Sequence, residues 1–355
     1  MVNLLDRYIS RQLIISSIMI LLLISLLRAL LSFLGEVAET GEGNYQISDA
    51  LLYTLLMIPS RILEMFPMSV LIGSLVSLGN MATNSEITVM RAAGMTTWRI
   101  AGAAIKGSIV LMLAVIFISE WMAPPATKAA QQLKSAAKSS EDLSISKGGL
   151  WLKKGSQILH IDQVLSDELL ENISIYTFDN NDRIHKVLNA NKAKMNDGVW
   201  ELYDVEESLF ELEQIKVSRY TSKIWIDPIE QTQLDTLSVA PEALSIFGVI
   251  EYLSYLQQNS METNVFELAF WRKLFQPFSI AIMIFLATSF VFGPMRSVSI
   301  GARILTGVAL GFGFHLASQS FGPISLVYKF PPLLGAFIPL AIFGFIAYYL
   351  MKRSA

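Results

Sequence analysis

The side chains most often used in catalysis are scarce in this sequence and lie far apart. The chain has 3 histidines and no cysteine in 355 residues, which excludes a thiolate nucleophile, a disulfide and a cysteine-ligated metal site. The histidines at positions 160, 185 and 315 lack metal-ligand spacing, and no G-x-S-x-G or H-E-x-x-H motif occurs. Residues 102–108 have the glycines of a phosphate-binding loop but Ser108 in place of its lysine. We therefore expect no catalytic, metal or cofactor site, and any ATP used must be hydrolysed on a partner chain.

Charged residues inside apolar runs are the first candidates for function. Arg28, Arg61, Glu64 and Glu120 each interrupt such a run, and a charge at the centre of a bilayer costs roughly 2.5–3.5 kcal/mol on insertion scales. Arg61 and Glu64 are three residues apart, so on a helix they share a face and can pair with each other. Alternatively, Arg28 and Arg61 meet an anionic headgroup, because a guanidinium binds phosphate through two parallel hydrogen bonds. Both interpretations remain open from the sequence.

The segment between the second and third apolar runs predicts a short helix near residues 84–93. Thr83-x-x-Glu86 has the spacing of a capping box, and Gly94 is a suitable stop. The residues that follow the cap at helical spacing are Ile87, Met90 and Arg91. The helix is either an ordinary connector or a rigid coupling helix that seats on a soluble ATPase.

Small residues in the fifth apolar run form a third candidate feature. Gly307-x-x-x-Gly311 permits close approach of two helices. Packing within the chain is one interpretation, and a seam that faces a partner and can open is the other.

These residues lie in a chain made of two kinds of segment. Charged residues make up 16% of the chain, against roughly 25% in soluble domains, and residues 123–265 hold 34 of the 57 formal charges. The net charge of −3 gives no support for a nucleic-acid partner. Six apolar segments have the roughly 20 residues that a membrane span needs. They are 13–34, 50–81, 100–122, 270–292, 300–321 and 333–351, and the second is expected to kink in its proline-containing first half.

Basic residues in the short flanks predict the orientation of these spans. One set of flanks carries most of the arginines, whereas residues 35–49 hold four acidic and no basic side chains. We therefore place both termini in the cytoplasm and residues 123–265 outside. Arg272, Lys273 and Lys329 are exceptions on the outer side.

The polar insert is predicted to be a β domain. Short β-branched or aromatic segments at 158–162, 173–178, 199–205 and 220–226 are separated by Asn, Asp and Gly turns, which is typical of antiparallel sheets. Helices are expected at 125–137 and 241–258. The predicted parts are thus 1–122 with three spans, 123–265 as the β domain with flanking helices, and 266–355 with three more spans.

Several stretches are long enough to be specific for one protein family. They are LLDRYISR at 4–11, FPMSVLIGSLVSLGNMATNSEITVMRAAGM at 66–95, EWMAPP at 120–125, ALSIFGVIEYL at 243–253, FWRKLFQPFS at 270–279 and FGPMRSVSIGARILTG at 292–307. Over nearly its whole length the chain resembles the lipopolysaccharide export permeases of Gram-negative inner membranes, LptF/LptG (YjgP/YjgQ). The LDRY and FGPMRSV stretches are more similar to the LptG branch.

The resemblance implies a permease with six spans and a periplasmic β-jellyroll. It implies pairing with the paralogue LptF, with two copies of the ATPase LptB, and with the single-span protein LptC beside the first span. Lipopolysaccharide would leave the outer leaflet of the inner membrane and pass to a periplasmic bridge. The coupling helix would meet the ATPase, with Glu86 as the docking residue and Ile87, Met90 and Arg91 beside it. The first and fifth spans would form lateral gates.

One departure from the family concerns the substrate contacts. Relatives often carry several basic residues at the outer end of the first span, whereas Arg28 is the only basic residue among residues 28–43 here, and the end of this stretch is acidic. The candidate lipopolysaccharide contacts are therefore Arg28, Arg61 and Lys134.

The expected fold is an α-helical integral membrane protein with six transmembrane helices and an inserted periplasmic antiparallel β domain, jellyroll-like, in the bacterial inner membrane. The expected function is that of a transporter permease, not an enzyme. The alternative is a membrane-anchored periplasmic scaffold without a transport role.

Overall fold

A computed structural model of the chain describes residues 4–138, 150–154, 156–166, 169–179, 183–196, 199–210, 214–225, 241–259, 261–293 and 298–354. The chain divides into two compact units. The first comprises Met1–Ser32, Met57–Ala126 and Asn264–Ala355, and the second comprises Phe33–Leu56 and Thr127–Thr263.

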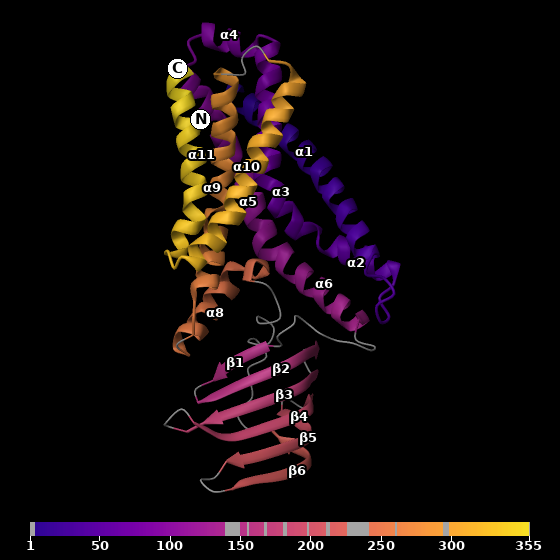
Figure 1. The fold of residues 1–355 in the computed structure, drawn as a ribbon. Helices are drawn as coiled ribbons and strands as arrows, with labels where there is room; N and C mark the ends of the chain where they lie inside the picture. Colours follow the sequence, from indigo (N-terminus) through magenta and orange to yellow (C-terminus); the bar gives the residue numbers. More distant parts are fainter. Residues whose placement is uncertain are drawn as a thin grey trace. The chain divides into compact units, whose positions relative to one another are not determined.

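Six helices are long and apolar enough to cross a membrane, which confirms the expected number of spans. The helices that carry them are α1 (Leu4–Val37), α3 (Ile58–Thr83), α5 (Thr97–Phe117) with its continuation, α9 (Asn264–Phe292), α10 (Ile300–Val327) and α11 (Pro332–Ser354). The short helix α4 (Glu86–Ala92) lies at the same end of this bundle as both chain termini (Figure 1).

The second apolar run is broken, as its prolines predict. Helix α2 (Ile47–Leu56) ends just before Met57, and α3 starts with Pro59 in its first turn. A proline fits there because the first amide groups of a helix have no partner within the helix. The membrane-crossing part therefore begins at Ile58.

The third span is continuous with the helix that was expected after it. A π-helical turn, η1 (Ile118–Met122), joins α5 directly to α6 (Ala123–Lys138), so one helical segment runs over Thr97–Lys138. The span expected at 100–122 and the helix expected at 125–137 are therefore parts of one continuous helical segment. Pro124 and Pro125 cannot donate to the carbonyls one turn earlier, and a π turn at this place accommodates the lost bonds without ending the helix.

One apolar core joins the membrane helices. Helix α3 lies at its centre, since most residues of its second half are buried. Burial differs strongly between spans: in their most apolar 18 residues, 61% are buried in α3 but only 17% in α1 and 22% in α10. Among the six spans, α1 and α10 thus have the smallest share of buried residues.

The β domain contains one antiparallel six-stranded sheet whose strands follow chain order (Figure 1). The strands are β1 (Leu150–Lys154), β2 (Gln157–Ser166), β3 (Leu169–Phe178), β4 (Ile184–Asn196), β5 (Val199–Phe210) and β6 (Ile215–Ile224). The four predicted strands correspond to β2, β3, β5 and β6, whereas β1 and β4 were missed. Side chains of the strands form an apolar core, which includes Leu159, Ile161 and Trp200. The predicted flanking helices are present as α6 and α8 (Ile246–Gln258), with Ser245 capping α8. These elements confirm the expected fold class of a helical membrane protein with an inserted β domain.

Candidate functional site

Glu64 of α3 lies beside polar side chains from two other membrane helices. Its Oε2 lies 3.9 Å from Arg28 Nη2 of α1, and its Oε1 lies 3.8 Å from His315 Nε2 of α10. Arg61 stands one turn earlier on α3 and is half-buried. The sequence suggested Arg61 as a partner of Glu64; the structure places Arg28 and His315 beside this carboxylate, from two other helices. His315 was dismissed from the sequence because it stands alone there.

The glycines of α10 bring this helix against α3. A Cβ added at Gly311 would lie 2.6 Å from Met68 Cγ, and one added at Gly307 would lie 3.1 Å from Ile72 Cγ1. The contacts therefore repeat every four residues along the two antiparallel helices. Four residues after Gly311 on α10, His315 lies beside Glu64, which is four residues before Met68 on α3. The glycine motif therefore packs within the chain, in agreement with the simpler of the two interpretations, and it positions His315.

Helix α1 also approaches its neighbours at glycines that the sequence analysis did not single out. A Cβ at Gly73 of α3 would lie 2.5 Å from Ser17 Cα, and one at Gly107 of α5 would lie 2.6 Å from Ser10 Cβ. Such contacts between backbones are the usual packing of small residues in membrane helices. The α1–α3 contact lies on the same two helices as the Arg28–Glu64 pair.

Helix α4 presents two different faces. Ile87 and Met90 are buried in the membrane-helix core, whereas Val89 is 67% exposed and Arg91 is exposed. Glu86 accepts a hydrogen bond from the Tyr8 hydroxyl of α1, with 3.0 Å between the oxygens. Ile87 and Met90 therefore anchor the helix, and the surface open to a partner is formed by Glu86, Val89 and Arg91.

The predicted capping box of α4 is wrong. Thr83 is the last residue of α3, and Ser85, with φ 62°, separates it from α4 without capping through its side chain. The Thr83 hydroxyl instead donates to the Gly79 carbonyl and accepts from Arg303 Nη1 of α10 at 3.1 Å. The predicted stop is confirmed, since Gly94 has φ 90° directly after the helix.

Arg303 connects the start of α10 to the end of α3. Its side chain is 1% exposed and lies over Gly79, where an added Cβ would be 2.5 Å from its Nη1. The absence of a side chain at Gly79 makes room for this guanidinium. The burial of Arg303 was not anticipated from the sequence.

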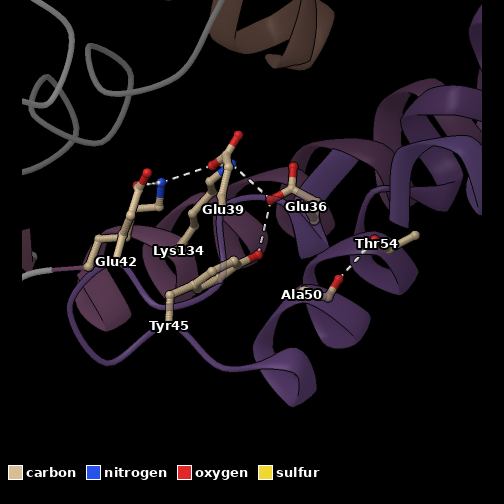
Figure 2. A network of polar contacts seen from close by, with 8 residues as sticks. Glu36, Glu39, Glu42, Tyr45, Ala50, Thr54 and Lys134 are labelled. Atoms are coloured by element: carbon tan, nitrogen blue, oxygen red, sulfur yellow. Dashed lines mark hydrogen bonds and ion pairs between the residues drawn. The ribbon is translucent and has the colours of Figure 1, made fainter. Parts of the chain in front are cut away.

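Lys134 belongs to a compact network at the end of α6 (Figure 2). Its Nζ lies 2.8 Å from Glu36 Oε2 and 2.7 Å from Glu39 Oε2, and 4.9 Å from the ring centre of Tyr53. Tyr45 donates to the same Glu36 oxygen at 3.0 Å. The neighbouring cation, Lys138, contacts Glu39 and Glu42 at 2.8 and 2.6 Å.

These contacts change the electrostatics of the acidic flank. The hydrogen bond from Lys134, followed by that from Lys138, holds the pKa of Glu39 below its ordinary value. Burial and the hydrogen bond to Glu36 raise the pKa of Tyr45. The acidic flank is therefore compensated by the lysines of α6, and Lys134 already has two carboxylates beside it. An anionic lipid that bound Lys134 would compete with both.

The described residues hold no group of three or more His, Asp and Glu side chains that could share a metal ion. What they hold instead is a set of intramembrane charges on α1, α3 and α10, together with a short helix at one end of the bundle. Comparison with known proteins identifies the family to which this arrangement belongs.

Residues 7–353 match the family described as lipopolysaccharide export system permease LptF/LptG. The chain belongs to this family. It is 37% identical over 354 residues to the lipopolysaccharide export system permease protein LptG of Escherichia coli (strain K12), covering 99% of this chain and 98% of that protein. It is 35% identical over 356 residues to the protein of the same name from Haemophilus influenzae, covering 100% of this chain and 99% of the relative. The family resemblance expected from the motifs is thus confirmed for LptF/LptG, with these LptG proteins as relatives.

Proposed function

We propose that the chain is the permease subunit of an ATP-binding-cassette transporter that extracts lipopolysaccharide from the bacterial inner membrane and passes it to a periplasmic bridge toward the outer membrane. The observation that carries this proposal is membership of the LptF/LptG family over residues 7–353, together with six spans. The expected partners are the paralogue LptF, an LptB dimer and LptC.

Extraction of such a substrate needs both an apolar chamber and an energy source. A lipid loses ~0.8 kcal/mol for each CH₂ group that leaves the bilayer interior, so a molecule with several acyl chains cannot leave unaided. The open faces of α1 and α10 are apolar and are the least buried of the spans. Facing a second six-span chain, they would enclose the lipid, with Arg28 and Arg61 offered to its anionic headgroup.

The energy would enter through α4. Its exposed side chains, Val89 and Arg91, and the half-buried Glu86 are available to a groove on the ATPase, whereas Ile87 and Met90 fix the helix to the bundle. A helix anchored in this way transmits a push to α1 and α3, because Glu86 is bonded to Tyr8 of α1 and α4 directly follows α3.

The orientation follows from the same assignment. The end of the bundle that holds α4 and both termini would face the cytoplasm, and the six-stranded sheet would lie in the periplasm. In this proposal, residues 1–122 and 266–355 form the membrane part, and residues 123–265 form the periplasmic domain.

Depletion of the chain in a Gram-negative host tests transport directly. If the chain moves the lipid, newly made lipopolysaccharide accumulates in the inner membrane after depletion. If it is only a scaffold for a periplasmic partner, surface delivery continues at the normal rate, and the proposal is wrong.

Two variants separate docking from internal structure at Glu86. Glu86→Gln removes the charge offered to the ATPase but keeps an oxygen that can accept from Tyr8. Tyr8→Phe removes only the internal hydrogen bond. We expect co-purification of the ATPase to fall in Glu86→Gln and to persist in Tyr8→Phe; the opposite result would show that Glu86 acts inside the chain.

A further inference from the structure

The contacts of Glu64 with Arg28 and His315 are close but are longer than hydrogen bonds. The distances to Arg28 Nη2 and His315 Nε2 are 3.9 and 3.8 Å, longer than the 2.7–2.9 Å of a charged hydrogen bond with good geometry. The side chains of Arg28, Glu64 and His315 remain 44%, 32% and 27% exposed. The carboxylate thus holds its neighbours by attraction without being locked to either, and all three groups can be reached from outside the protein.

The packing of the helices makes this meeting specific. The close packing of Gly307 and Gly311 against α3 fixes the position of α10 along that helix, and with it the place where His315 lies beside Glu64. Arg28 arrives from α1 on the same carboxylate. Because α1 and α10 are the two spans with the least buried apolar surface, Glu64 lies where the two most exposed spans are tied together.

The donors beside the Glu64 carboxylate, Arg28 and His315, would also suit a larger anion. A guanidinium offers a planar pair of N–H groups, and a histidine ring has an N–H donor in either protonation state. In the low-dielectric interior of a membrane, neither an arginine nor a carboxylate is stable without a counter-charge. An anion that enters would therefore compete with Glu64 for Arg28 and His315.

We propose that Arg28 and His315 form a phosphate-binding site whose resident counter-ion is Glu64, and that the phosphate of an anionic lipid displaces this carboxylate when it binds. This inference rests on the proposed function and deepens it, since it adds His315 as a ligand and gives Glu64 the task of limiting how tightly the lipid is held. Return of Glu64 to its two partners favours release of the phosphate and reconnects α1 with α10.

The test measures equilibrium binding of two probes to the complete transporter complex in lipid nanodiscs. One probe is lipid A with both phosphates, and the other is the same lipid A after removal of its phosphates. Glu64→Gln removes the competing charge and is expected to bind the phosphorylated probe roughly tenfold more tightly, equivalent to ~1.4 kcal/mol. Its affinity for the dephosphorylated probe should remain that of the parent.

Further variants keep the result independent of folding. Arg28→Gln and His315→Leu should weaken binding of the phosphorylated probe alone, and His315→Gln, which retains an N–H donor, should bind more tightly than His315→Leu. Glu120→Gln is the matched control, because it makes the same change at a carboxylate that lies 3.9 Å from Lys273 elsewhere in the bundle; it should leave the preference for phosphate unchanged.

Unchanged or weaker binding of the phosphorylated probe by an assembled Glu64→Gln complex overturns the inference, as does an equal gain for both probes. In those cases the parent still binds lipid A and the proposed function stands. If the parent complex binds neither probe, the proposed function falls and this inference with it.

Discussion

Substitution of Gly311 by alanine tests the seam that holds α10 against α3. The added Cβ would lie 2.6 Å from Met68 Cγ, 3.2 Å from Met68 Cβ and 3.3 Å from Met68 Cα. Rotation of the Met68 side chain relieves the first contact but not the other two, because Cα and Cβ move only with the backbone. Helix α10 must therefore shift outward by a few tenths of an ångström.

Two opposing effects determine how Gly311→Ala changes the free energy of unfolding. Overpacking of a well-packed contact costs about 1–3 kcal/mol, whereas replacing glycine by alanine inside a helix gains about 1 kcal/mol. Gly313→Ala is the matched control, since it gains the same helix propensity and its Cβ would meet only Phe343 Cζ at 4.0 Å. The difference between the two variants isolates the steric cost of about 1–3 kcal/mol.

Thermal unfolding in detergent, followed by tryptophan fluorescence, measures this difference. Gly311→Ala and Gly307→Ala should both unfold at a lower temperature than the control, Gly313→Ala. Equal midpoints for Gly311→Ala and Gly313→Ala would refute the close α3–α10 contact and, with it, the positioning of His315.

Three further outcomes are expected. Lys134 and Lys138 lower the pKa of Glu39, so the contribution of this pairing to stability is present above the ordinary pKa of 4.5 and is lost as the pH falls through the lowered value. In Glu39→Gln, the unfolding midpoint should therefore fall less steeply with decreasing pH than in the parent. An unchanged fall would contradict the pairing. Val89→Glu should abolish ATPase co-purification with normal thermal stability, whereas Ile87→Ala should destabilise the chain by about 2–5 kcal/mol, as unfolding midpoints would show. Arg303→Met should cost about 1.5–3 kcal/mol through loss of its charged hydrogen bond, and a midpoint equal to the parent's would argue against that bond.

The spans could be predicted from the sequence because the bilayer requires a long apolar helix wherever the chain crosses. Their ends were harder to predict. The sequence between residues 118 and 126 contains Glu120 and two prolines and resembles a helix end, yet a π turn carries the helix through it. Hydropathy measures the cost of burial in lipid and gives no information on whether a polar helix continues beyond the membrane.

Strand β4 was missed for a related reason. Most of its residues, Ile184–Asn196, are polar, and two of its three buried side chains are alanines, Ala190 and Ala193. The sheet holds this segment through pairing with β3 and β5 rather than through its own propensity. A pattern with so few large apolar residues gives no strand signal.

The candidate site was predicted in part. Arg28, Arg61 and Glu64 were recognisable because a charge in an apolar run is costly. The role of His315 was not, since its connection to Glu64 depends on a ladder of contacts between helices far apart in sequence. The lysine network was also missed, although its spacing is visible in the sequence: Glu36, Glu39 and Glu42 repeat every three residues, and Lys134 and Lys138 are four apart, which places each set on one face of a helix or turn.

Photocrosslinking from position 61 in living cells tests the proposed transport role most directly. With a benzophenone amino acid in place of Arg61, the permease assignment predicts an adduct with lipopolysaccharide. The same amino acid at Phe345, which is 69% exposed on α11, should give none. Absence of the adduct at position 61, or equal adducts at both positions, would contradict the assignment of this face of α3 to the substrate.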